Sequence, residues 1–266
     1  VAFDAKFVAS PAPVNAGLGP LFNNTGCSRC HVRDGRGLPV LGSGPIGSPM
    51  LVRVSNPTGS PEAPGGANPV PGLGTQLQDH ATHGHAPEAT IGVRWIAQSG
   101  TYGDGESFTL RRPVLEIVTV SGAPLSRDVM TSARIAPPVF GLGLLEAVSD
   151  ESILAMADPD DRDGDGISGR ANMTWDVVKA RSAVGRFGWK AGIPSLLQQT
   201  AAAYANDMGV GNALFPDSEG AVELDRETLE AAAFYTQTLA VPRRRAVFDA
   251  DVRRGEVFTL IGPNGA

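Results

Sequence analysis

The segment Gly26-Cys27-Ser28-Arg29-Cys30-His31 decides which fold and which chemistry this chain of 266 residues is expected to have. It contains the only two cysteines of the chain, three positions apart, so a disulfide framework is excluded. Cys-x-x-Cys-His is the pattern of covalent haem attachment, because two thiols at this spacing add to the two vinyl groups of one haem. The sequence therefore predicts haem c bound through Cys27 and Cys30, with His31 as the proximal ligand of the iron.

Two other interpretations of the cysteine pair are weaker. A redox dithiol needs a strand–helix–strand context, and residues 20–40 show no such pattern. A zinc site needs a fourth ligand and usually a second cysteine pair, which the chain lacks. Zinc held by Cys27, Cys30 and His31 would leave the protein colourless, whereas haem would colour it.

Outward from this motif, the sequence is typical of helices joined by long loops. Residues 34–75 are rich in glycine and proline and predict a long ordered loop. Residues 90–120 predict a β-hairpin around the turn Tyr102-Gly103-Asp104-Gly105. Helices are expected over 15–25, 144–157, 193–208 and 225–240, and a last one begins near residue 251. Together these patterns predict a mainly α, cytochrome c-like haem domain with a small β-hairpin insertion and long Gly/Pro-rich loops.

The composition limits the partners of the protein. The net charge of −6, from 22 basic and 28 acidic residues, disfavours binding to nucleic acid or to an anionic membrane. No apolar run of about 18 residues occurs, so no transmembrane segment is expected. The chain opens at Val1 rather than at an initiator Met, and we expect a processed or cut N-terminus there.

Several further segments resemble one bacterial family, and this resemblance runs almost from end to end. They are Gly19-Pro20-Leu21-Phe22-Asn23, His31 to Gly37, Gln76-Leu77-Gln78, Leu110-Arg111-Arg112-Pro113, Arg134 to Ala147, Asp163 to Asn172, Gly185 to Ala191, Gln198-Gln199 and Asp207-Met208-Gly209. Together they resemble the di-haem oxidoreductases, often labelled thiol oxidoreductases, which are distant relatives of the di-haem cytochrome c peroxidases. The resemblance implies a redox protein that uses two haems.

The resemblance also implies a second Cys-x-x-Cys-His near the C-terminus, in a second cytochrome domain. Residues 253–258 resemble the approach to that motif, but the chain stops at Ala266. We therefore expect a first c-type haem domain over 1–246 and the start of a truncated second cytochrome c-like domain over 247–266.

The sixth position of the iron decides between two kinds of chemistry. Closure by Met is typical of electron transfer, whereas an open position is typical of peroxide or small-molecule chemistry. Met208 is one candidate for the distal ligand, because it lies at an expected helix end in a segment that resembles the family's; ordinary core packing is the other interpretation. The other candidates are His80, His83, His85, Met130 and Met173. The three histidines are read as a solvated loop in preference to an opportunistic metal site.

An acidic stretch predicts a shortened calcium loop. Asp161, Asp163 and Asp165 offer carboxylates at alternate positions, and Gly166 follows at the bend, as at the start of a Ca²⁺-binding loop. The twelfth position is Asn172 instead of Glu, so a complete EF-hand is absent. An acidic turn without a metal is the alternative.

Three further features carry weaker hypotheses. In related two-haem enzymes a Trp passes electrons between the haems, and the resemblance implies that role for Trp189, with core packing as the alternative. Arg134 and Glu146 flank an apolar run and are candidates for lining a pocket. The run Arg243-Arg244-Arg245 is interpreted as solvated charge near a domain boundary, with pairing to haem propionates or a redox partner as the alternative.

The functional expectation is a c-type haem redox protein, an oxidoreductase of peroxidase-like or thiol oxidase-like type that works by electron transfer through covalent haem. The alternative is an electron-carrying cytochrome domain without its own catalysis. Its partner would be a redox protein or a small-molecule oxidant or reductant. A periplasmic or secreted location is expected, because covalent haem attachment normally occurs there. No catalytic residue is assigned.

Overall fold

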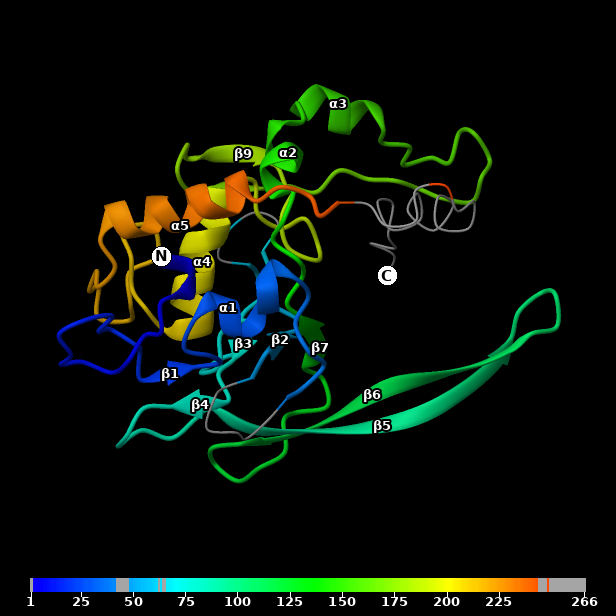
Figure 1. Cartoon of the computed structure of the whole chain (residues 1–266). Helices are drawn as coiled ribbons and strands as arrows, with labels where there is room; N and C mark the ends of the chain where they lie inside the picture. The colour runs from blue at the N-terminus through cyan, green and yellow to red at the C-terminus, as the bar shows by residue number, and fades with distance from the viewer. Residues whose placement is uncertain (1, 42–47, 62, 64–65, 244–247, 249–266) are drawn as a thin grey trace.

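The computed structural model describes residues 2–41, 48–61, 63, 66–243 and 248, and Figure 1 shows how their elements are arranged. Helix accounts for 21% of the described residues and strand for 27%, and the strands form several small antiparallel sheets. Within the described residues, only two helices have seven or more residues. The mainly α, cytochrome c-like fold class is therefore a wrong prediction, and the fold is mixed α and β.

The two long helices form one half of the core. Ser195 caps α4 (Leu196–Met208) and Asp225 caps α5 (Arg226–Thr238), each by accepting a hydrogen bond from a backbone N–H three residues ahead. These helices confirm the expectations for 193–208 and 225–240, apart from a few terminal residues. Their facing sides bury a cluster made of Phe7, Ala201, Tyr204, Met208, Val210, Leu224, Leu229 and Ala232.

A three-stranded antiparallel sheet forms the other half of the core. Its central strand β2 (Met50–Ser55) pairs with β3 (Gln76–Leu77) on one side and with β7 (Met130–Ile135) on the other. Alternate residues of β2 point inward, as period-two patterning requires. The second core cluster consists of Val52, Val54, Val70, Leu77, Ala89, Ile91 and Ile117.

The predicted β-hairpin is confirmed. Its strands have 13 residues each, so it is not the small insertion that was expected. Strands β5 (Ala89–Thr101) and β6 (Ser107–Thr119) pair along their whole length. Figure 1 shows this ribbon leaving the body of the protein, so that its turn lies far from the remaining elements. Only its base, which includes Ile91 and Ile117, belongs to the buried core.

The other elements are short, and they are joined by loops that wrap around the two halves of the core. They are η1 (Ala2–Asp4), β1 (Leu21–Phe22), α1 (Cys27–Cys30), η2 (Val32–Asp34), β4 (His80–Ala81), α2 (Leu142–Ala147), α3 (Asp150–Ala155), β8 (Met173–Asp176) and β9 (Arg181–Val184). β1 pairs with β4, and β8 pairs with β9.

One predicted helix is wrong and another is interrupted, each for a local reason. Over 15–25 the backbone of Asn15 has a left-handed φ of 52°, and the chain then extends into β1, which pairs with β4. The helix expected over 144–157 is broken after α2, because Val148 has an extended backbone with ψ of 131°. Ser149 then caps the separate helix α3 by accepting from Ser152 N.

The proposed second domain over 247–266 lies outside the described residues, apart from Phe248. So do the helix expected from residue 251 and most of the arginine run at 243–245. Among the helices of the described part of the chain, none is both long and apolar enough to span a bilayer.

Glu88 ties the base of the ribbon to the end of β3. Its Oε2 accepts a hydrogen bond from the backbone N–H of Gln78 at 2.7 Å. Burial raises the pKa of Glu88 from 4.5 to about 7. An acid with a raised native pKa favours the fold while it is protonated, so this stability is lost as the pH rises from about 4.5 through about 7.

Glu88→Gln should therefore raise the Tm at about pH 8 and leave the Tm at about pH 4 nearly unchanged, because Gln keeps an acceptor for Gln78 and carries no charge. Thermal unfolding followed by circular dichroism at both pH values measures this difference. Glu219→Gln, at an exposed position, is the matched control. An effect of Glu88→Gln that is the same at both pH values would contradict the assignment.

Candidate functional site

The cysteine pair occupies one helical turn. α1 begins at Cys27 and ends at Cys30, so the two thiols, three residues apart, lie on the same face. Both side chains are partly buried. The Cys27 side chain packs against the α4–α5 core cluster, and Cys30 Sγ lies 3.5 Å from the carbonyl oxygen of Ser48.

His31 follows α1 and is held in one orientation. Its Nδ1 lies 2.6 Å from the carbonyl oxygen of Pro137, 106 residues away in the sequence. Because a carbonyl can only accept, Nδ1 carries the proton and the lone pair of the ring is on Nε2. Burial lowers the pKa of His31, which favours the neutral imidazole that a metal ligand must be.

The loop after the motif is fastened to the rest of the protein at several points. Asp34 accepts a hydrogen bond from the Tyr235 hydroxyl of α5 at 3.0 Å, and its carbonyl accepts from Val139 N. Gly37 N–H donates to the carbonyl of Ala136 at 2.9 Å. A Cβ at Gly37 would lie 2.8 Å from the carbonyl oxygen of Cys30, so only glycine fits at this crossing.

A buried polar network lies behind the cysteines. Asn23 is at its centre: its amide donates to Leu77 O and Asp79 Oδ1, and its Oδ1 accepts from Gln76 Nε2. Gln76 also donates to Asp207 at 2.8 Å, and Asp79 accepts from the Ser48 hydroxyl at 2.5 Å. The network thus joins the loop at Ser48, which contacts Cys30, to strand β3 and to the end of α4.

The environment of the thiols disfavours a free redox dithiol. Burial, together with the Asp207 carboxylate, raises the pKa of both Cys27 and Cys30 to about 12. A reactive dithiol needs a thiolate, whereas the thioether of attached haem is neutral. Within the described residues, neither cysteine belongs to a group of three or more metal-ligating side chains.

Met208 is buried, and its contacts with the core cluster explain this burial without ligation of an iron. Its side chain is 3% exposed and belongs to the core cluster that Cys27 contacts. Ligation of the iron by Met208 therefore stays a prediction. Met130 and Met173 are 55% and 47% exposed, on strands of two different sheets.

The three histidines do not form a common site in the described structure. His80 Nδ1 is 3.0 Å from Asp79 Oδ1, and its ring lies against Phe22 of β1. His83 and His85 are exposed. No metal-ligating group that includes them is found within the described residues.

Trp189 lies close to the segment that holds His31. Its Nε1 donates to the carbonyl of Ile135 at 2.6 Å, two residues before the carbonyl that His31 uses. The guanidinium of Arg36 lies 5.6 Å from the centre of its ring, and the side chain is 37% exposed. Trp189 is therefore a surface residue joined to the motif through residues 135–137, and its role in electron transfer stays a prediction.

The acidic loop brings its three carboxylates together. Ligand atoms of Asp161, Asp163 and Asp165 lie within 4.8 Å of one another. Asp161 also accepts from Gly166 N, as in an ordinary acidic turn. Asn172, at the twelfth position, donates instead to the carbonyls of Lys190 and Ala191. The arrangement is compatible with a shortened calcium loop, which stays a prediction.

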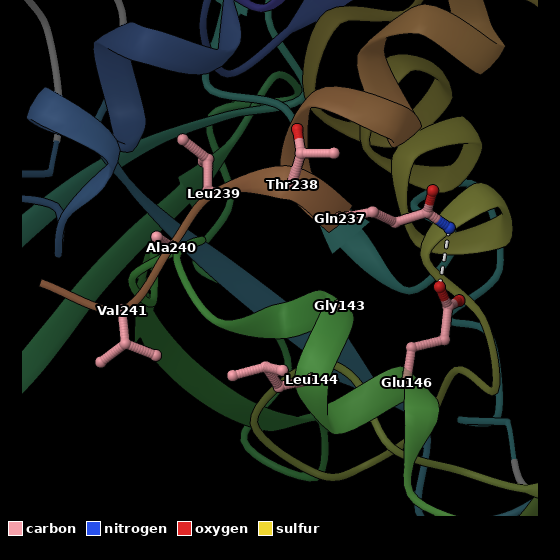
Figure 2. Close-up of a pocket in the computed structure, with 8 residues that line it drawn as sticks. All are labelled: Gly143, Leu144, Glu146, Gln237, Thr238, Leu239, Ala240 and Val241. Carbon is pink, nitrogen blue, oxygen red and sulfur yellow. Dashed lines mark hydrogen bonds between the residues drawn. The ribbon is translucent and has the colours of Figure 1, made fainter.

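A surface cavity of about 510 Å³ lies between α2 and the end of α5. Figure 2 shows Glu146 on its wall, hydrogen-bonded to Gln237. The other Glu146 oxygen accepts from Leu196 N at 2.7 Å, so this carboxylate joins α2, α4 and α5. Arg134 does not line the cavity. Glu146 is thus a structural link, and the cavity contains no residue of the haem motif.

Asn23, Pro137 and Asp207 are the residues whose roles sequence reasoning missed. All three lie in segments that resemble the family, and that was the only signal. A carbonyl acceptor such as Pro137 O, or an amide at the centre of a network, leaves no pattern in a single sequence, because its partners are distant along the chain.

If the acidic loop binds Ca²⁺, added calcium should raise the Tm of the protein. Saturation at about 100 times the dissociation constant would add about 2.7 kcal/mol to the free energy of unfolding. Asp163→Asn together with Asp165→Asn should abolish this rise, whereas Asp217→Asn, in another acidic turn, should keep it. Thermal unfolding with calcium or with a chelator is the measurement. A Tm that does not respond to calcium would assign the loop as an acidic turn.

Comparison with known families agrees with the motif and the resemblance. Residues 1–223 match the family model described as "Di-haem oxidoreductase, putative peroxidase". No curated protein matches the chain. No solved structure matches it either. Since the family model covers most of the chain, the resemblance is confirmed: this protein belongs to the di-haem oxidoreductase family.

Proposed function

We propose that this protein is a c-type haem oxidoreductase, peroxidase-like or thiol oxidase-like, that transfers electrons through haem bound covalently at Cys27 and Cys30. The observation that carries the proposal is the arrangement of the motif: both thiols lie on one turn of α1, and the contact of Nδ1 with Pro137 O leaves the lone pair of the His31 ring on Nε2, the atom that would bind a metal. Membership of the di-haem oxidoreductase family supports it. Haem bound there would supply one-electron chemistry.

The residues around the motif suit a haem. Val32, Leu38 and Val40, just beyond His31, are about half exposed, and such apolar surface is typical of a site that a large ligand covers. Arg29 Nε is buried and has no hydrogen-bond partner in the described part of the chain. Because an unpaired buried donor is costly, a haem carboxylate is a fitting acceptor for it.

The protein would hold the iron ligand by linked contacts. Pro137 O sets the tautomer and the orientation of His31, and Asp34 joins the following loop to Tyr235 of α5. A ligand held in this way keeps its geometry when the charge of the metal changes. Trp189, bonded to the same 135–137 segment, is the side chain we propose as the electron route toward a second redox centre.

An electron-carrying domain without its own catalysis is the second candidate. The observation that favours it is the position of Met208, which is buried in the cluster that also contacts Cys27. Closure of the iron by this thioether would leave no place for a substrate. We propose in either case a periplasmic or secreted location, with a redox protein or a small-molecule oxidant or reductant as partner.

The two candidates predict different visible spectra for the protein secreted with its haem. The oxidoreductase should show an oxidised spectrum that changes when peroxide is added, because its sixth position is open or displaceable. An electron carrier should show a low-spin spectrum that does not change when peroxide is added. Met208→Ala should convert that low-spin spectrum to high-spin, and Met130→Ala, at an exposed methionine, is the control. A low-spin, peroxide-insensitive wild type would contradict catalysis at this haem.

A further inference from the structure

The β5–β6 ribbon has one face on which no described residue is fully buried. Odd-numbered residues share the face whose base is buried, where Ile91 lies opposite Ile117. Even-numbered residues share the other face. This face is exposed at the base of the ribbon as well, where Val118 is 44% exposed. In Figure 1 the outer half of the ribbon stands clear of every other described element.

The outer half of this even face carries several apolar side chains. Ile96 and Phe108 are half-buried and Leu110 is 59% exposed, and the polar side chain of Gln98 lies on the same face, opposite Leu110. Phe108 lies across Gly100, where a Cβ would come within 2.4 Å of its ring, so the glycine lets the aromatic ring cover the ribbon. A two-stranded ribbon is marginally stable alone in water, and exposed apolar surface of this kind is typical of an interface.

The charges on the same face are separated along the ribbon. Arg112 lies on the side of the base, and Glu106 lies beside the turn. Neither side chain has a hydrogen bond or an ion pair in the described part of the chain, whereas Arg94, farther in, already pairs with Glu116 at 3.2 Å. One end of the apolar stretch thus carries an unpaired cation and the other an unpaired anion.

The charged and apolar residues of β6 are placed symmetrically along the strand about Thr109, the residue that pairs with Ser99. On β6, Leu110 lies one residue inward from Thr109 and Phe108 one residue outward; Arg112 lies three residues inward and Glu106 three residues outward. Two ribbons can stack with their even faces together and their strands antiparallel. A two-fold axis that passes between the faces at Thr109, perpendicular to the strands, then places β6 of one subunit over β6 of the other. It brings each Arg112 opposite Glu106 of the partner subunit, and each Leu110 opposite Phe108 of the partner subunit.

We propose that the even face of the β5–β6 ribbon is a docking surface for the same face of a second copy of this chain. The surface is self-complementary in charge and in apolar contacts, as a two-fold interface must be, and the symmetry doubles every contact. Only the outer halves of two ribbons meet, so the buried area is small and the dimer forms in a concentration-dependent way.

Sedimentation of the full-length protein over a wide concentration range tests this proposal. The wild type should dimerise, more weakly at high salt. Arg112→Glu and Glu106→Arg should each weaken the dimer by about tenfold or more, because each places like charges opposite one another. The double variant Arg112→Glu/Glu106→Arg should restore it. Arg127→Glu, an equal charge change at an exposed position off the ribbon, should leave it unchanged.

Three outcomes would overturn the proposal. One is a wild type that is monomeric at every concentration, which would leave the ribbon free for a different partner. Another is a dimer that Arg112→Glu does not weaken, which would place the interface elsewhere. The third is a double variant that stays monomeric although circular dichroism shows it folded, because the two charges would then not face each other.

Discussion

The hydrogen bond between His31 Nδ1 and the carbonyl of Pro137 is the contact on which the site depends. It spans 106 residues and fixes both the tautomer and the direction of the ring. Around it, the bond from Gly37 N–H to Ala136 O and that from Tyr235 to Asp34 hold the same loop. Three segments that are distant in the sequence therefore meet at the motif: the loop that follows His31, residues 136–137 and helix α5.

The polar network centred on Asn23 reaches the cysteines through Ser48, whose carbonyl lies 3.5 Å from Cys30 Sγ. It links β3, the end of α4 and the loop at Ser48. Because burial and Asp207 raise the pKa of both thiols to about 12, their surroundings suit neutral sulfur better than a free thiolate. Neutral sulfur, the fixed imidazole and Arg29 Nε, which has no hydrogen-bond partner among the described residues, thus share one environment.

The sequence was informative where the signal is local. The motif, the capped helices α4 and α5 and the turn of the hairpin each have a short pattern that physical rules recognise. The fold class failed because Gly/Pro-rich segments were read as loops around helices, whereas β2 lies within 34–75 and pairs with β7 about 80 residues later. Such long-range pairing, like the partner of His31, leaves no local pattern. The length of the ribbon was visible in its alternation, but its exposure was not.

Intact-mass measurement under denaturing conditions tests the central claim most directly. The full chain is secreted into a compartment with haem-attachment machinery, beside a Cys27→Ala/Cys30→Ala variant. We expect the wild type to gain the mass of one haem, the gain to survive unfolding, and the variant to show none. A wild type that carries no covalent haem and keeps two free thiols would contradict it.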